Sequence, residues 1–239
     1  MGHKSIRTGT RGLVVAMLAA VTVTAIGVAP VGAAGSGTTV AGGNGVGTNS
    51  NQTSNPYGVA VDAAGNLYVA DRDNHRVQKW LPGATVGLTV AGGHGQGSAD
   101  NQLDSPSGVA VTSDGTLYVA DTQNNRIQRF FEGIEFGVTV AGGNGEGSAA
   151  NQLNYPYALA VRSTDGSLYI ADTGNNRVQK WAAGALAGTT VAGGNGRGSG
   201  AAQLSSPQGV AVVANGVFFV SDSGNDRVQR FPAGSSSLT

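Results

Sequence analysis

The sequence repeats itself four times, and this repetition limits the possible folds more than any other feature. The segment "TVAGG" begins at Thr39, Thr89, Thr139 and Thr190, which gives a period of 50 residues with one residue inserted in the third copy. A period of this length is typical of solenoids, propellers and arrays of small modules. The chain is therefore expected to consist of four similar units.

Each repeat contains four short strand-like runs separated by turn-forming residues. In the first copy the runs are "YGVAV", "NLYVAD", "RVQKW" and "GLTVAGG". Outside the N-terminal leader, no run of ten or more residues has the periodicity of a helix. Four antiparallel strands form the blade of a β-propeller. We therefore predict an all-β propeller of four-stranded blades, at about residues 57–93, 107–143, 157–194, and 208–231 plus 37–43.

The distribution of apolar residues indicates where each strand lies in a blade. The runs "GVAV" and "LYVA" are apolar or small on both faces, as in strands that are covered on both sides. The third run, "RVQKW", mixes charged and amide side chains with Val77 and Trp80. We expect the first two runs near the propeller axis, and the third farther out and partly exposed to water.

The two ends of the repeat region complement each other. The fourth repeat stops after its third strand, at 227–231, whereas residues 37–43 read as a fourth strand without a blade of its own. Pairing these segments would close the ring and remove two exposed sheet edges. We predict a closed four-bladed monomer. An open arc and a ring shared between copies are the alternatives.

Residues 1–34 differ from the rest in composition. Lys4, Arg7 and Arg11 precede a long apolar stretch that ends in small residues, which is typical of a cleaved secretory signal. We predict a Sec-type signal peptide, a secreted or cell-envelope location, and no membrane contact after cleavage. An uncleaved anchor is the alternative, because the stretch approaches the length of a membrane span. Residues 35–239 then form the propeller.

Charge and cysteine content exclude some classes of function. The chain has no cysteine, so disulfides and thiol chemistry are absent. Three of the 14 basic residues lie in the leader, whereas all 14 acidic residues follow it. The remainder is mildly acidic and has no basic cluster, so a nucleic-acid partner is not expected.

The segment "PYGVAVDAAGNLYVADRDNHRVQKW" (56–80) resembles the NHL repeat. The shared features are the Gly-Val-Ala-Val run, the Gly-Asn-Leu-Tyr-Val-Ala-Asp run, and Asp-x-x-Asn-x-Arg before Val-Gln. Four tandem copies extend the likeness over nearly all of the chain after the leader. The resemblance implies a propeller, usually of six blades, that serves mostly as a binding platform. Four repeats are fewer than the family's usual number, so the resemblance does not determine how many blades the ring contains.

An Asp–Asn–Arg trio recurs in every repeat. Its members are Asp71, Asn74 and Arg76; Asp121, Asn124 and Arg126; Asp172, Asn175 and Arg177; and Asp222, Asn225 and Arg227. An active site is normally one asymmetric constellation, so a trio in each blade predicts a structural role. Asp and Asn side chains stabilise turns, and Asp can pair with Arg across a hairpin. We predict no catalytic residue.

Six residues remain as candidates for a ligand-binding face. They are Asp73, His75, His94, Tyr57, Tyr155 and Tyr157. The first three occur in one repeat only and belong to loops on the same face of a propeller. Two histidines and a carboxylate could bind a metal, but nothing in the sequence brings them together, so we predict no metal and no other cofactor. The tyrosines precede or begin innermost strands and could contact a ligand at the channel mouth.

The predicted function follows from the predicted architecture. A propeller presents a wide face of variable loops, and loops carry recognition. We predict a binding scaffold for a protein, a peptide or a glycan, and not an enzyme. The alternative is a propeller-type lyase or lactone hydrolase with a metal in the channel, as the resemblance allows. The innermost strands, rich in valine, alanine and glycine, offer little for such chemistry.

Overall fold

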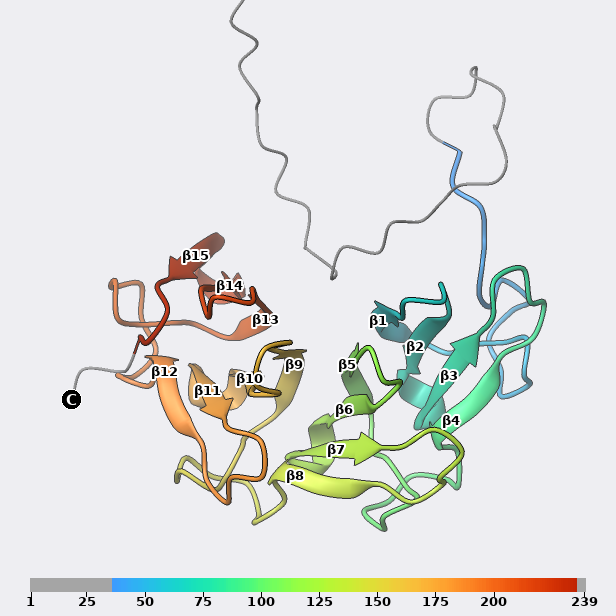
Figure 1. The fold of residues 1–239 in the computed structure, drawn as a ribbon, viewed down its shortest axis with the longest axis horizontal. Helices are drawn as coiled ribbons and strands as arrows, with labels where there is room; N and C mark the ends of the chain where they lie inside the picture. Colours follow the sequence, from blue (N-terminus) through green and yellow to red (C-terminus); the bar gives the residue numbers. More distant parts are fainter. Residues whose placement is uncertain (1–35, 236–239) are drawn as a thin grey trace, which may run out of the picture.

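The computed structural model describes residues 36–235, and the predicted signal peptide at 1–34 lies outside them. Four consecutive antiparallel sheets are arranged in an arc around a common axis (Figure 1). The predicted all-β propeller of four repeats is confirmed.

Within the described residues, the first three blades have four strands each, and the fourth has three. Blade 1 comprises β1 (Pro56–Val61), β2 (Leu67–Asp71), β3 (Arg76–Trp80) and β4 (Leu88–Gly92). Blade 2 comprises β5 (Pro106–Val111), β6 (Leu117–Asp121), β7 (Arg126–Phe130) and β8 (Val138–Gly142). Blade 3 comprises β9 (Pro156–Val161), β10 (Leu168–Asp172), β11 (Arg177–Trp181) and β12 (Thr189–Gly193). Blade 4 comprises β13 (Pro207–Val212), β14 (Phe218–Asp222) and β15 (Arg227–Phe231).

The second and third strands of each blade are joined by one turn of 3-10 helix. In blade 1 this turn is Arg72–Asn74, and it ends at His75 in the left-handed conformation with φ 51°. The turns in the other blades have the same form and end at Asn125, Asn176 and Asp226. Among residues 36–235, no helix is long and apolar enough to span a membrane.

The hydrophobic cores lie between blades. Val77 and Ala91 of blade 1 pack with Leu103 and Val109 at the start of blade 2, and the next two boundaries repeat this arrangement. The third strands of blades 1 to 3 are therefore mostly buried, and the expectation that they would be partly wet is wrong for them, whereas β15 of blade 4 is partly exposed. Val77 is covered by the following blade.

The predicted closure of the ring by residues 37–43 is also wrong. These residues form no strand, and blade 4 has three strands in the order β13-β14-β15. Figure 1 shows β1 and β13 at the two ends of an open arc. The innermost strands of neighbouring blades pack closely: a methyl group at Gly108 would lie 2.7 Å from the Tyr157 carbonyl oxygen. The arrangement of the four blades leaves the two ends of the arc apart.

Candidate ligand-binding groove between the first two blades

The Asp–Asn–Arg trio ties each blade to the loop that precedes it. The Asp71 carboxylate is fully buried and accepts hydrogen bonds from Arg76 Nε at 2.7 Å, Asn74 Nδ2 at 2.9 Å and the Ser54 backbone N–H at 2.6 Å. The other guanidinium nitrogens of Arg76 donate to carbonyl oxygens within residues 48–52. The trio therefore spans the hairpin and the incoming chain at once.

Burial and hydrogen bonding act in opposite directions on the pKa of Asp121, Asp172 and Asp222. Burial raises the pKa of Asp121 and of Asp172, although their Asn and Arg partners act in the opposite direction. Burial also acts to raise the pKa of Asp222, but there the hydrogen bonds, first from Asn225, outweigh it and lower the pKa. In each blade both carboxylate oxygens accept hydrogen bonds from the protein. The hydrogen-bonding groups of the trio are therefore used within the protein, which agrees with a structural role.

Two of the three predicted tyrosines contact each other on the inner side of the arc. The rings of Tyr57 and Tyr157 pack edge to face with their centroids 5.5 Å apart. The Arg72 guanidinium lies 5.5 Å from the centroid of the Tyr57 ring. Tyr155 is held differently, since its backbone N–H donates to Asn125 Oδ1 at 2.8 Å. Tyr57 and Tyr157 come from β1 and β9, so they contact each other past the intervening blade.

The structure gives the two histidines separate roles. His75 Nδ1 accepts a hydrogen bond from the Ser105 backbone N–H at 3.1 Å and so joins blades 1 and 2. His94 Nε2 lies 3.9 Å from Glu135 Oε1. Asp73 accepts a hydrogen bond from Asn55 Nδ2 at 3.3 Å. In the described part of the chain, no three His, Asp or Glu side chains are grouped so that they could hold a metal ion.

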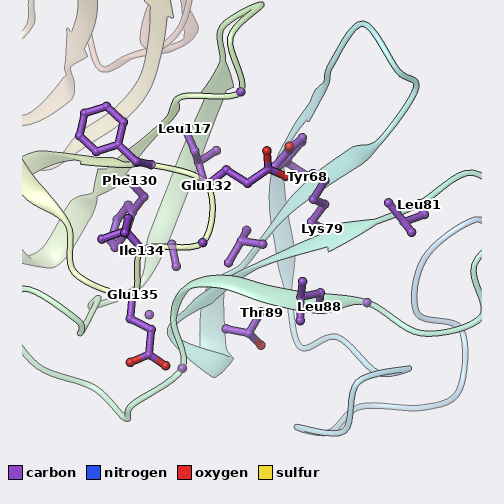
Figure 2. Close-up of a pocket in the computed structure, with 18 of the residues that line it drawn as sticks. Tyr68, Lys79, Leu81, Leu88, Thr89, Leu117, Phe130, Glu132, Ile134 and Glu135 are labelled. Carbon is purple, nitrogen blue, oxygen red and sulfur yellow. Dashed lines mark hydrogen bonds and ion pairs between the residues drawn. The ribbon is translucent and has the colours of Figure 1, made fainter.

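A groove of about 850 Å³ lies between the outer strands of blades 1 and 2 (Figure 2). Buried Leu117 and Phe130 line its inner part. Leu88 on β4 lines one side, and the loop 131–135 of blade 2 lines the other. Leu88 is 66% exposed and Ile134 is 52% exposed. The groove is therefore mainly apolar and open to solvent.

Charged side chains flank this apolar surface. Lys79 Nζ donates to Glu132 Oε1 at 2.8 Å and lies 5.6 Å from the centroid of the Tyr68 ring. The hydrogen bond to Glu132 raises the pKa of Lys79, and burial raises the pKa of Tyr68. The side chain of Glu135 is 70% exposed. Because Lys79 is engaged by Glu132, the remaining carboxylate makes the rim of the groove slightly acidic.

Of the residues predicted for a ligand face, His94 lines the groove, but the loop that forms its other side was not predicted, although the sequence carried a signal for it. Residues 131–136 read "FEGIEF", whereas the equivalent loops read "LPGATV" (81–86) and "AAGALA" (182–187). Two phenylalanines, an isoleucine and two glutamates are thus individual to the second repeat. Comparison of this loop between the repeats is therefore enough to identify it.

Comparisons with known proteins agree with this architecture. A family model described as "NHL repeat" matches residues 53–80, 103–130, 153–181 and 204–231. No curated protein matches the chain significantly. An auxiliary nutrient binding protein from Bacteroides thetaiotaomicron VPI-5482 is similar with a TM-score of 0.56 and 17% identity, over 72% of this chain and 46% of that one. A gluconolactonase from Xanthomonas campestris is similar with a TM-score of 0.57 and 16% identity, over 80% and 63%. The chain spans less than two thirds of either structure, and likeness at this identity shows the fold alone.

Proposed function

Since the chain belongs to the NHL-repeat family, we propose that it is a binding scaffold, secreted or held in the cell envelope, that takes an extended peptide segment of a partner protein. The observation that carries this proposal is the apolar groove between blades 1 and 2. One side of the groove is the loop 131–135, whose side chains the other repeats lack, so this side is not part of the shared blade pattern. Residues that differ from the shared repeat pattern are free to serve ligand binding, because the blade does not require them.

An extended peptide fits the strand that borders the groove. β4 is the outermost strand of blade 1, so its outer edge pairs with no other strand of that sheet. A peptide can add to such an edge through backbone hydrogen bonds, while alternate side chains enter a neighbouring pocket. The volume of about 850 Å³ lies within the usual range of ligand sites, about 300–1,000 Å³. It can therefore take several apolar side chains.

The charges at the rim of the groove limit the kind of peptide that can bind. Glu135 stands exposed at the rim, whereas Lys79 is paired with Glu132. A peptide with apolar side chains and a basic residue would contact the apolar lining of the groove and pair with Glu135 at its rim. An acidic segment would place like charges together.

The alternative of a lyase or lactone hydrolase has less support. In the described chain no donor set for a metal is gathered, and the likeness to a gluconolactonase is a likeness of fold. Metal analysis of the purified protein tests this alternative, because stoichiometric zinc or calcium would favour an enzyme over a scaffold.

The groove can be tested with a random peptide library displayed on phage and panned against the immobilised protein. We expect enriched peptides to share apolar positions at alternate residues. The substitution Ile134→Asp places a charge in the apolar groove and should weaken their binding at least about tenfold, or about 1.4 kcal/mol. Isothermal titration with one enriched synthetic peptide measures this change.

The matched control is Leu186→Asp, which introduces the same charge into the equivalent loop of blade 3, at a residue that is 91% exposed. This variant should bind the peptide as the unmodified protein does. Equal binding by the Ile134 variant would show that the groove is not the site. A library that yields no enriched peptide would contradict the scaffold proposal itself.

A further inference from the structure

The two end faces of the arc carry exposed apolar side chains whose counterparts in the other blades are buried or half-buried. Val59 on blade 1 is 62% exposed, whereas its counterparts Val109 and Leu159 are 8% and 6% exposed. Val228 on blade 4 is 70% exposed, whereas its counterpart Ile127 is fully buried against the next blade. The first face is of the kind that receives a preceding blade, and the last face is of the kind that receives a following one.

The same hydrogen bond occurs at each of the three joints between blades, and, within the described residues, the two ends of the arc carry its unpaired donor and acceptor. The left-handed residue of each turn accepts the backbone N–H that opens the next blade: the donor–acceptor pairs are Ser105 to His75 at 3.1 Å, Tyr155 to Asn125 at 2.8 Å, and Ser206 to Asn176 at 2.9 Å.

The fourth such acceptor is Asp226 and the unused donor is Asn55, both with φ 51°. Within residues 36–235, neither the Asp226 carboxylate nor the Asn55 N–H has a hydrogen-bond partner. The last face thus offers an acceptor and the first face a donor, as at each of the three formed joints.

Blade 4 and the N-terminal segment are complementary in a second way. Within the described residues, β15 has no strand on its outer edge. Residues 38–42 read "TTVAG", which is identical to β12, the outer strand of blade 3. They pair with no strand, and Val40 is 67% exposed. A segment with the sequence of an outer strand and a sheet without its outer strand are therefore present at opposite ends of the same arc.

We propose that copies of this chain associate head to tail, with blade 4 of one copy packed against blade 1 of a second copy. Residues 38–42 of the second copy then add to β15 as its outer strand. In the formed blades Arg76 pairs with Gly92, and Arg177 pairs with Gly193. The same register places Arg227 opposite Gly42 of the second copy.

A second copy is the occupant because the two faces are counterparts of joints that already pack within the chain. One copy cannot join its own ends in this structure, since they lie at opposite ends of the open arc (Figure 1). The monomer expected from the sequence depended on closure by residues 37–43, which the structure does not show. Because the contact joins two different faces, it can repeat along a chain of copies or close into a ring.

The new joint is more polar than the three internal joints. Thr53 stands where the other repeats have Leu103, Leu153 and Leu204, which are fully buried. Ser221 likewise stands where the first blade has Ala70. The association is therefore expected to be reversible and to depend on concentration, not to form a permanent assembly.

The test uses the purified protein and two substitutions, Val59→Lys and Val228→Lys, with mass measured by size exclusion and light scattering. Both side chains are exposed in a single copy, so neither change should prevent folding. We expect the apparent mass of the unmodified protein to rise with concentration to at least twice that of one chain. Each variant alone should stay monomeric, because a lysine would be buried at the joint.

An equal mixture of the two variants should form a complex of one copy of each, at twice the mass of either alone. Each partner still has the face that the other has lost, so one joint can form. Leu186→Lys, a control in the exposed loop between β11 and β12 of blade 3, should associate as the unmodified protein does. A protein that stays monomeric as concentration is raised, or a mixture that stays monomeric, would overturn the proposal.

Discussion

Replacing Asp121 by alanine is expected to lower the free energy of unfolding by about 3–5 kcal/mol, as when one partner of a buried ion pair is removed. Arg126 Nε donates to Asp121 Oδ2 at 2.7 Å, and both side chains are buried. Burial raises the pKa of Asp121, so the ionised pair itself is not strongly favourable. The loss arises because the Arg126 charge stays buried without its partner. Chemical denaturation followed by tryptophan fluorescence measures it.

The equivalent change in blade 4, Asp222→Ala, should cost less. The Arg227 side chain is 31% exposed, so water can solvate the guanidinium after its partner is removed. The two substitutions alter the same motif and differ chiefly in burial. Equal losses would show that the cost comes from the hairpin alone and not from an unpaired buried charge.

Replacing Ile127 by alanine should lower the free energy of unfolding by about 2–5 kcal/mol, the usual cost of truncating a buried isoleucine. Ile127 is fully buried and packs with Leu153 and Leu159 of the next blade. The removed atoms leave a cavity between two sheets, where tightly packed strands limit relaxation. Denaturation of this variant uses the same measurement.

Val228 occupies the same repeat position in blade 4 and is 70% exposed. At concentrations where the protein is a single copy, Val228→Ala should change stability by less than about 0.5 kcal/mol. The contrast between the two positions tests whether the cores lie between blades. A large loss from Val228→Ala in a monomer would mean that blade 4 is covered by something other than a second copy.

Local patterns in the sequence predicted the blades well. Alternating strand and turn signals define the strands because each blade is built from contacts close in sequence. Closure was predicted wrongly because it depends on the angle between blades, whose innermost strands meet in backbone contacts such as that of Gly108 with Tyr157. No pattern in the sequence encodes that angle. The exposure of the third strand was also predicted wrongly for blades 1 to 3, because charged and amide side chains were taken to indicate a surface in contact with water.

Those polar side chains are buried because each has a specific partner. Arg76 reaches carbonyl oxygens of the loop 48–52, and Gln78 donates to the Ser50 carbonyl oxygen at 3.3 Å. The partners lie more than 20 residues away along the chain, outside any local window. The groove differs from these cases, because residues 131–136 stand out by simple comparison of the repeats.

The placement of the cores between blades has a consequence for how such a chain can grow. One blade alone has no neighbour against which to bury its apolar faces, so stability is gained at each joint and not within each unit. Tandem duplication of one internal 50-residue unit, such as residues 89–138, would add one blade and one complete joint. Lengthening the arc in this way requires no new kind of contact. A gene that already encodes two compatible repeats can therefore extend the protein by copying alone.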